Sequence, residues 1–363
     1  MKSYVTVHKN SPDFLKYLEG TFSDTQVAIP MESVNVNSQS ESITFELLDK
    51  KEIQRPSWKE FLSSLLKIYK FLYVLFPIFY ISLYYYVNAW SFDVSTMILA
   101  AISSLLLFMG VNLRSDYWDH IRGLDRVIKS NQSKPIVKGW IKAGVVKKLS
   151  LAFMLTALIL SIPIIIAFPK VLVVILLSVA LIFLGMLQGK TIYRDYYLGD
   201  LFWALLVGPI LAVGFELAIS GQWHLQFLIF GFVWAILIFF KLQLNNFEFL
   251  LAGSLAGVKN LVNQFGFENG KKFILANWLF FIIVFTLFQG AYFHWMVWLA
   301  SVVALVIMTI RNNKTLWYLP SPSGSDVSKA VLELHQLYAL AVTLWMVQTL
   351  FLFVLKSMEV IFK

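Results

Sequence analysis

Long apolar stretches recur along the sequence after residue 64, and they decide which folds this chain can adopt. Most reach the roughly 20 residues that a helix needs to cross a hydrocarbon layer about 30 Å thick. Because the runs are continuous, they exclude a closed β-barrel, whose strands are short and alternate. Hydrophobic residues make up 58% of the chain and charged residues 14%, so a water-soluble domain could not cover itself with polar surface. We predict an all-α, polytopic membrane protein with about nine transmembrane helices, over residues 65–88, 94–113, 148–167, 171–189, 199–220, 225–244, 273–290, 292–310 and 336–356.

Lysine and arginine collect in alternate connections between these helices, which indicates their orientation. Nine of them lie in residues 114–148, whereas the connections on the opposite side are short and nearly uncharged. We therefore predict a protein of the inner (cytoplasmic) membrane, with its N-terminus in the cytoplasm and its C-terminus outside. The net charge of +9 is spread over these loops without a compact basic domain, so we expect the lipid bilayer and no nucleic acid as a partner. Cysteine is absent from the sequence, which excludes disulfides and thiolate metal sites.

The first 60 residues differ from the rest in being polar. Two strand-like pieces, Tyr4–His8 and Ile43–Leu48, flank a stretch rich in serine and asparagine. Burying so few apolar residues cannot offset the conformational entropy that ordering costs. We therefore expect a mostly flexible cytoplasmic extension, with a small, poorly packed appendage as the alternative. Residues 61–363 would form the transmembrane domain.

Acidic residues are concentrated after the second predicted span. Asn112, Asp116 and Asp119 follow one another at helical spacing and would line one face of a continuing helix. Gly123 can end that helix and let Asp125 turn back toward the same face. Three converging carboxylates repel one another unless a cation lies between them, and Mg²⁺ is the natural candidate because it prefers oxygen ligands. The alternative is a set of solvated loop acids.

The same segment resembles a known family. It reads SDYWDHIRGLD and is similar to the first Asp-rich motif of the UbiA superfamily of intramembrane prenyltransferases, most closely in the 1,4-dihydroxy-2-naphthoate polyprenyltransferase branch. One position departs, because Ser115 stands where the motif has Asn. The resemblance continues through KPIVKGWI (134–141), YLGDLFWALLVGPILAVG (197–214) and LNNFEFLLAGSLAGVKNLVNQFG (244–266), and it covers roughly residues 60–356.

The last of these segments departs from the second Asp-rich motif of the family. Asn245 and Asn246 match it, but Phe249 and Gly253 stand where the family has aspartates, and apolar groups cannot ligate Mg²⁺. Lys259 lies one residue after the usual lysine. Either an enzyme works with one metal ion and cationic side chains, or its substrate has changed, or the chain is a nonenzymatic paralogue.

The resemblance implies a UbiA-type helical bundle that transfers a polyprenyl group from its diphosphate to an aromatic acceptor, a precursor of quinone or menaquinone type. It implies Mg²⁺ held by Asp116, Asp119 and Asp125, with Asn112 beside them. Further candidates for substrate binding are Arg122, Lys190, Tyr193, Arg194, Asp200, Asn245, Asn246 and Lys259. Two alternatives remain open, a degraded paralogue that binds isoprenoid lipid or a membrane partner and a terpene-cyclase-like enzyme. The sequence does not indicate the oligomeric state.

Overall fold

The computed structural model describes most of the chain and divides it into two compact units by their internal contacts. The first unit comprises residues 1–72, 105–159 and 252–258, and the second comprises residues 73–104, 160–251 and 259–363. The described residues are 3–31, 41–53, 56–60, 71–123, 125, 134–186, 197, 199–255, 258–292, 295–322 and 325–361.

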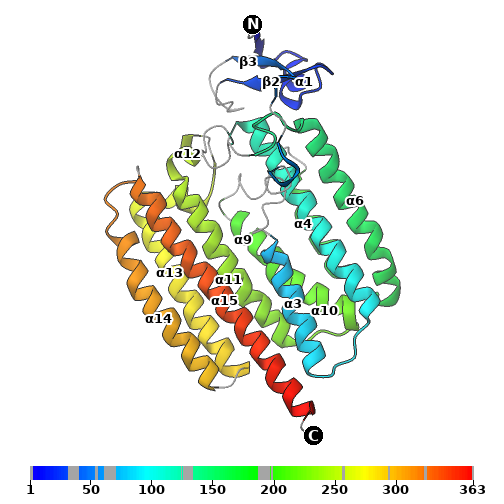
Figure 1. Cartoon of the computed structure of the whole chain (residues 1–363), viewed down its shortest axis with the longest axis vertical. Coiled ribbons are helices and arrows are strands. Elements are labelled where there is room, and N and C mark those ends of the chain that lie inside the picture. The colour runs from blue at the N-terminus through cyan, green and yellow to red at the C-terminus, as the bar shows by residue number, and fades with distance from the viewer. Residues whose placement is uncertain are drawn as a thin grey trace. The chain divides into compact units, whose positions relative to one another are not determined.

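Most of the described chain is helical, as the apolar runs predict (Figure 1). The helices are α1 (Phe14–Glu19), α3 (Leu72–Val87), α4 (Val94–Arg122), α6 (Ala143–Ala167), α7 (Val171–Met186), α9 (Gly199–Leu205), the π-helical turn η3 (Leu206–Ile210), α10 (Leu211–Ser220), α11 (Leu225–Glu248), α12 (Leu250–Leu255), α13 (Leu261–Tyr292), α14 (Trp295–Trp317) and α15 (Ser325–Ile361). Six helical segments in the described chain are long and apolar enough to cross a membrane, so the chain is a multi-pass membrane protein. Three shorter apolar helices, Leu72–Val87, Val171–Ile182 and Trp298–Ile310, fall where the sequence predicts the remaining spans, and the total of nine stays a prediction.

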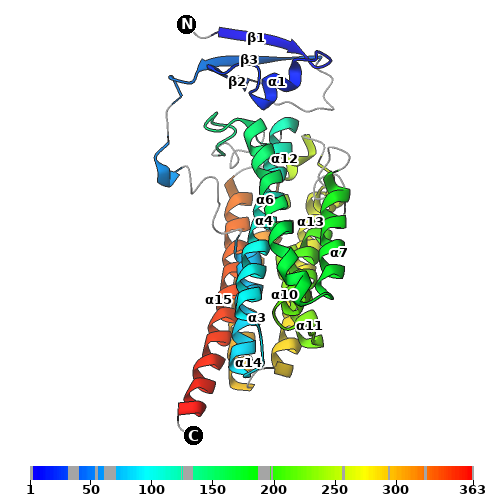
Figure 2. The ribbon, with the colours of Figure 1, turned by 90° about the vertical axis from the view of Figure 1, so that its right-hand side faces the viewer.

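A three-stranded antiparallel sheet begins the first unit. Its strands are β1 (Ser3–His8), β2 (Gln26–Pro30) and β3 (Ser42–Asp49), in the order β1-β3-β2 (Figure 2). Side chains alternate between the two faces of a strand, and Ile43 and Phe45 of β3 are buried on one of them. Phe14 of α1 packs against Phe45, with their ring centroids 6.3 Å apart.

The sheet lies in the segment that the sequence predicts to be a mostly flexible extension, and that flexibility stays a prediction. The two strand-like pieces are indeed β1 and β3, but they belong to a folded structure over residues 3–31 and 41–53. Its apolar face shares one hydrophobic core with Leu113, Tyr117 and Ile121 of α4 and with Val146 of α6. The apolar residues of the extension alone do not form this core. Residues of α4 and α6, more than 60 positions away along the chain, complete it.

Helices α11, α13, α14 and α15 pack against one another in the second unit (Figure 1). Aromatic side chains fill the interior, and Tyr80 stacks on Phe230 with ring centroids 4.1 Å apart. The ring of Trp345 lies within 5.4 Å, centroid to centroid, of both Phe76 and Phe230. This packing is dense, and the rings prefer such edge and offset contacts.

Two glycines allow the closest approach between helices in the second unit. A Cβ on Gly208 would lie 2.5 Å from the carbonyl oxygen of Gly231, and a Cβ on Gly231 would lie 2.5 Å from the Cα of Pro209. Pro209 stands in η3, where the missing proline N–H is accommodated by the wider π-helical turn. The Gly-Pro pair thus brings this helix backbone to backbone with α11.

Gly266 interrupts α13 with φ 73° and ψ −174°, a conformation that is accessible essentially only to glycine. A Cβ at this position would meet no atom within 4 Å, so a substitution tests the backbone alone. We expect Gly266→Ala to lower the free energy of unfolding by about 2 kcal/mol. Equilibrium unfolding in mixed micelles with increasing denaturing detergent measures this change. An unchanged midpoint would show that the kink is not strained.

Candidate functional site

The acidic motif lies where α4 ends in the first unit. The helix stops at Arg122, and Gly123 adopts φ 78° while its N–H donates to the carbonyl oxygen of His120 over 3.1 Å. This left-handed residue reverses the chain direction, as the glycine predicts. Asp125 therefore returns toward Asp116 and Asp119 instead of continuing along the helix.

The three carboxylates converge on one ammonium group. Lys134 Nζ lies 2.7 Å from Asp116 Oδ1, 3.3 Å from Asp119 Oδ2 and 2.7 Å from Asp125 Oδ1. The side chains of Asp119 and Asp125 are 2% and 0% exposed, and that of Lys134 is 5% exposed. Such buried charges persist only when they are paired. We call Asp116, Asp119, Asp125 and Lys134 the acidic cluster.

The electrostatics of the cluster favour additional positive charge. Burial raises the pKa of the Asp125 carboxyl above its ordinary value, Lys134 opposes that rise, and the negative charges of Asp119 and Asp116 reinforce it. The second oxygen of Asp125, Oδ2, is buried and has no hydrogen-bond partner among the described residues. An unpartnered carboxylate oxygen beside two further carboxylates is a donor set that suits a hard divalent cation.

Mg²⁺ fits the chemistry of these ligands but not their present arrangement. Within the described ranges, no three carboxylates or imidazoles are placed to hold a metal ion as they stand. Lys134 lies at the point on which the oxygens converge. A metal ion would therefore require the ammonium group to leave and the carboxylates to draw closer.

The N-terminal extension contacts the motif helix through a half-buried polar group. Tyr117 Oη donates a hydrogen bond to Glu19 Oε1 over 2.5 Å, and Lys147 Nζ donates to the same oxygen over 2.9 Å. Burial alone would raise the pKa of Glu19, but the hydrogen bonds from Lys147 and Tyr117 and the charges of Lys147 and Arg114 outweigh burial and lower it. Glu19 thereby ties the end of α1 to the residue next to Asp116.

This contact predicts a pH-dependent stability. The pKa of Glu19 in the folded protein lies below its ordinary value of 4.5, so its contribution is complete above 4.5 and is lost as the pH falls through the folded-state pKa. We expect Glu19→Gln to lower the free energy of unfolding by about 2 kcal/mol near neutral pH. We also expect the variant to lose less stability than the unchanged protein when the pH falls below 4.5. Unfolding followed by tryptophan fluorescence at several pH values measures both effects. The exposed Glu52→Gln serves as the control, and equal curves for the two variants would contradict the assignment.

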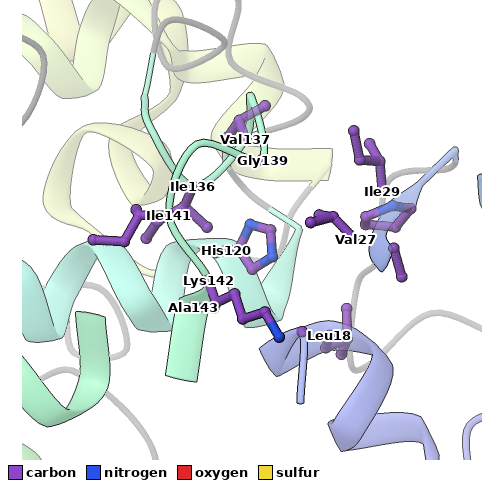
Figure 3. Close-up of a pocket in the computed structure, with 13 residues that line it drawn as sticks. Leu18, Val27, Ile29, His120, Ile136, Val137, Gly139, Ile141, Lys142 and Ala143 are labelled. Carbon is purple, nitrogen blue, oxygen red and sulfur yellow. The ribbon is translucent and has the colours of Figure 1, made fainter. Parts of the chain in front are cut away.

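A small pocket separates the sheet from the segment after the motif (Figure 3). Val27 and Ile29 of β2 line one side, Ile136 lines the other, and the His120 ring lies between them. Lys142 also lines the pocket, and its Nζ donates to the carbonyl oxygen of Ser23 over 2.7 Å. Apart from His120 and Lys142, the lining is mostly apolar.

A second polar group lies in the second unit. Asp200, in the first turn of α9, accepts hydrogen bonds at Oδ2 from Asn246 Nδ2 over 2.5 Å and from Gln243 Nε2 over 3.2 Å. The sequence counts Asp200 among the candidates for substrate binding. In the structure its carboxylate joins α9 to α11 at the start of the altered second motif.

Of the remaining predicted residues, the structure describes the side chains of Asn112, Asn245 and Lys259. The Asn112 side chain donates to the carbonyl oxygen of Phe108 on its own helix over 2.8 Å, and so does not join the acidic cluster. Asn245 is half-buried and Lys259 is exposed. Lys190, Tyr193, Arg194 and the side chain of Arg122 lie outside the described residues.

Two lysines that were not among the predicted site residues stand out in the structure. Lys134 contacts all three aspartates of the acidic cluster. The available sequence signal was its position in KPIVKGWI, shortly after the acidic residues. Lys241 is half-buried in α11, with Nζ 2.8 Å from His335 Nδ1. Its position four residues before Asn245, on one helix face, was the available signal. A lysine so placed within an apolar helix is a candidate for anion binding.

Comparisons with known proteins agree with this fold. A digeranylgeranylglyceryl phosphate synthase structure matches with a TM-score of 0.55 and 17% identity, over 80% of this chain and 99% of that chain. A UbiA homologue from Archaeoglobus fulgidus bound to DMAPP and Mg²⁺ matches with a TM-score of 0.53 and 16% identity, over 78% and 98%. A UbiA homologue from Aeropyrum pernix K1 matches with a TM-score of 0.50 and 15% identity, over 76% and 98%. At these identities the likeness concerns the fold alone.

The family comparison is more direct. No curated protein sequence matched the chain. The sequence profile of the UbiA prenyltransferase family matches residues 74–337, which contain the acidic cluster, Asp200 and the altered second motif but not the N-terminal sheet. With most of its length matched by this profile, the chain belongs to the UbiA prenyltransferase family.

Proposed function

We propose that this protein transfers a polyprenyl group from its diphosphate to an aromatic acceptor within the membrane, with Mg²⁺ held by Asp116, Asp119 and Asp125. The observation that carries the proposal is the convergence of these three carboxylates on a single cationic group. Family membership supports the reaction class, and the homologue bound to DMAPP and Mg²⁺ shares the fold. We further propose an acceptor of the quinone-precursor type and a cytoplasmic position for the acidic cluster, because lysine and arginine crowd the loops around it.

In the proposed reaction the protein forms no covalent bond with the substrate. Its main task is to stabilise the negative charge of the departing diphosphate. The allylic C–O bond breaks and its electron pair leaves with the diphosphate, the acceptor ring supplies the pair for the new C–C bond, and the ring then loses a proton. Bound Mg²⁺ would neutralise the departing diphosphate. The three aspartates would hold that charge in place, and the burial of Asp119 and Asp125 would keep water from weakening the attraction.

The test is an assay with purified protein and Mg²⁺. Prenyl diphosphates of several chain lengths are combined with phenolic and naphthoic acceptors, and both products are measured. Diphosphate released together with a prenylated ring supports the proposal. Diphosphate released without an acceptor indicates cyclisation, and no diphosphate released in any combination contradicts an enzymatic function.

One observation favours a second candidate, a nonenzymatic member of the family that binds isoprenoid lipid. Phe249 is half-buried at the end of α11 and Gly253 is buried in α12, so neither of these two positions offers an oxygen ligand from its side chain. Binding of a prenyl diphosphate without turnover, measured in the same preparation, would support this candidate.

A further inference from the structure

The least expected feature of the acidic cluster is the side chain at its centre. A buried ammonium group makes close contacts with three carboxylates that come from α4 and from the chain after Gly123. Lysine is a compact point charge with three donors, and here its ammonium group contacts three carboxylates. It therefore supplies, among these oxygens, the positive charge that a divalent cation would otherwise supply.

The backbone around Lys134 holds it at this point. Pro135 restricts the conformation of Lys134, and the Lys134 carbonyl oxygen accepts from Lys138 N over 3.1 Å. Trp140 N donates to the Pro135 carbonyl oxygen over 2.9 Å, and Gly139 takes a left-handed φ of 70°. The ammonium group thus extends from a hydrogen-bonded turn of the backbone.

We infer that Lys134 is a resident cation that competes with a divalent metal ion for the acidic cluster and thereby sets its metal affinity. Two cations cannot share the point where the carboxylates meet, because they would repel each other at short range in a buried site. The carboxylates remain paired through Lys134 until a metal ion displaces it. This inference rests on the proposed function for its choice of metal, but it concerns binding and not turnover.

The test measures metal binding in the absence of substrate. The full-length protein in detergent is titrated with Mn²⁺, and free Mn²⁺ is followed by electron paramagnetic resonance. Lys134→Met is expected to bind Mn²⁺ at least about tenfold more tightly than the unchanged protein, because the competing charge is gone. Lys138→Met, four residues on and exposed beside Trp140, is the matched control and is expected to leave the affinity unchanged. Equal or weaker binding by Lys134→Met overturns the inference.

A double variant locates the bound ion. Asp116→Asn combined with Lys134→Met removes a proposed ligand together with the lysine and is expected to lose the gain in affinity. A gain that survives in the double variant would place the ion elsewhere and overturn the inference.

Thermal unfolding covers the case in which Lys134→Met folds poorly, since it leaves three carboxylates without their shared partner. Added Mn²⁺ is then expected to restore its melting temperature, whereas a variant that Mn²⁺ cannot restore contradicts replacement of the lysine by a metal ion. The results of these metal-binding experiments are independent of the results of the prenyl-transfer assay. A protein that releases no diphosphate can still show the competition, and one that transfers prenyl groups can still fail to show it.

Discussion

Asp116→Asn is expected to lower the rate of diphosphate release by at least about 100-fold under saturating substrate and Mg²⁺. The amide keeps the shape of the carboxylate but removes its charge. In the structure, Asp116 Oδ1 lies 2.7 Å from Lys134 Nζ. A group that acts on charge developing during the reaction affects the turnover number more than binding. The measurement is a radiolabelled prenyl-diphosphate assay with purified protein, once a substrate has been found.

The control for this variant is Asp13→Asn. Asp13 is an exposed acid that pairs with Lys16 over 2.7 Å in the first unit, and its loss is expected to leave the rate unchanged. Thermal unfolding of both variants shows whether Asp116→Asn remains folded. A folded Asp116→Asn protein with full activity would remove Asp116 from the proposed metal site.

Gly231→Ala is expected to produce a large loss of stability, about 2–3 kcal/mol in the free energy of unfolding. The added methyl group would lie 2.5 Å from the Cα and 2.8 Å from the N of Pro209, and these backbone atoms cannot turn aside as a side chain can. Alanine favours the helix over glycine by about 1 kcal/mol, but the cost of the steric overlap is larger than this gain. Equilibrium unfolding with increasing denaturing detergent measures the difference.

Gly290→Ala is the matched control in another helix of the same unit. Its Cβ would lie 3.4 Å from Trp298 Nε1, which is an ordinary contact, so we expect an unchanged or slightly raised stability. If both variants behave alike, the close approach of Gly231 to Pro209 is not as tight as the structure indicates.

The features that the sequence predicted correctly are local ones. An apolar run long enough to cross a membrane is visible within about 20 residues, and six of the expected spans are long apolar helices. The facing positions of Asp116 and Asp119 follow from helical spacing, and the turn at Gly123 follows from the conformational freedom of glycine. The two strand-like pieces of the sequence, Tyr4–His8 and Ile43–Leu48, coincide with β1 and β3.

The features that the sequence did not reveal depend on contacts between distant residues. Lys134 is 18 positions from Asp116, and nothing in the spacing of a lysine after a loop says that it will enter an acidic cluster. Asn112 shares a helix face with the acids, yet its amide bonds the preceding turn of its own backbone. Local patterns set which groups can meet, whereas packing decides which of them do.

The shared core of the first unit limits how the protein can be shortened or recombined. Cutting the chain back to residues 74–337, where the family profile applies, would uncover Leu113, Tyr117 and Ile121 on the helix that carries Asp116 and Asp119. Apolar surface of that kind invites aggregation in water. A chimera between this protein and a relative without the sheet would need compensating polar substitutions along α4, so sheet and motif helix are expected to vary together as homologues diverge.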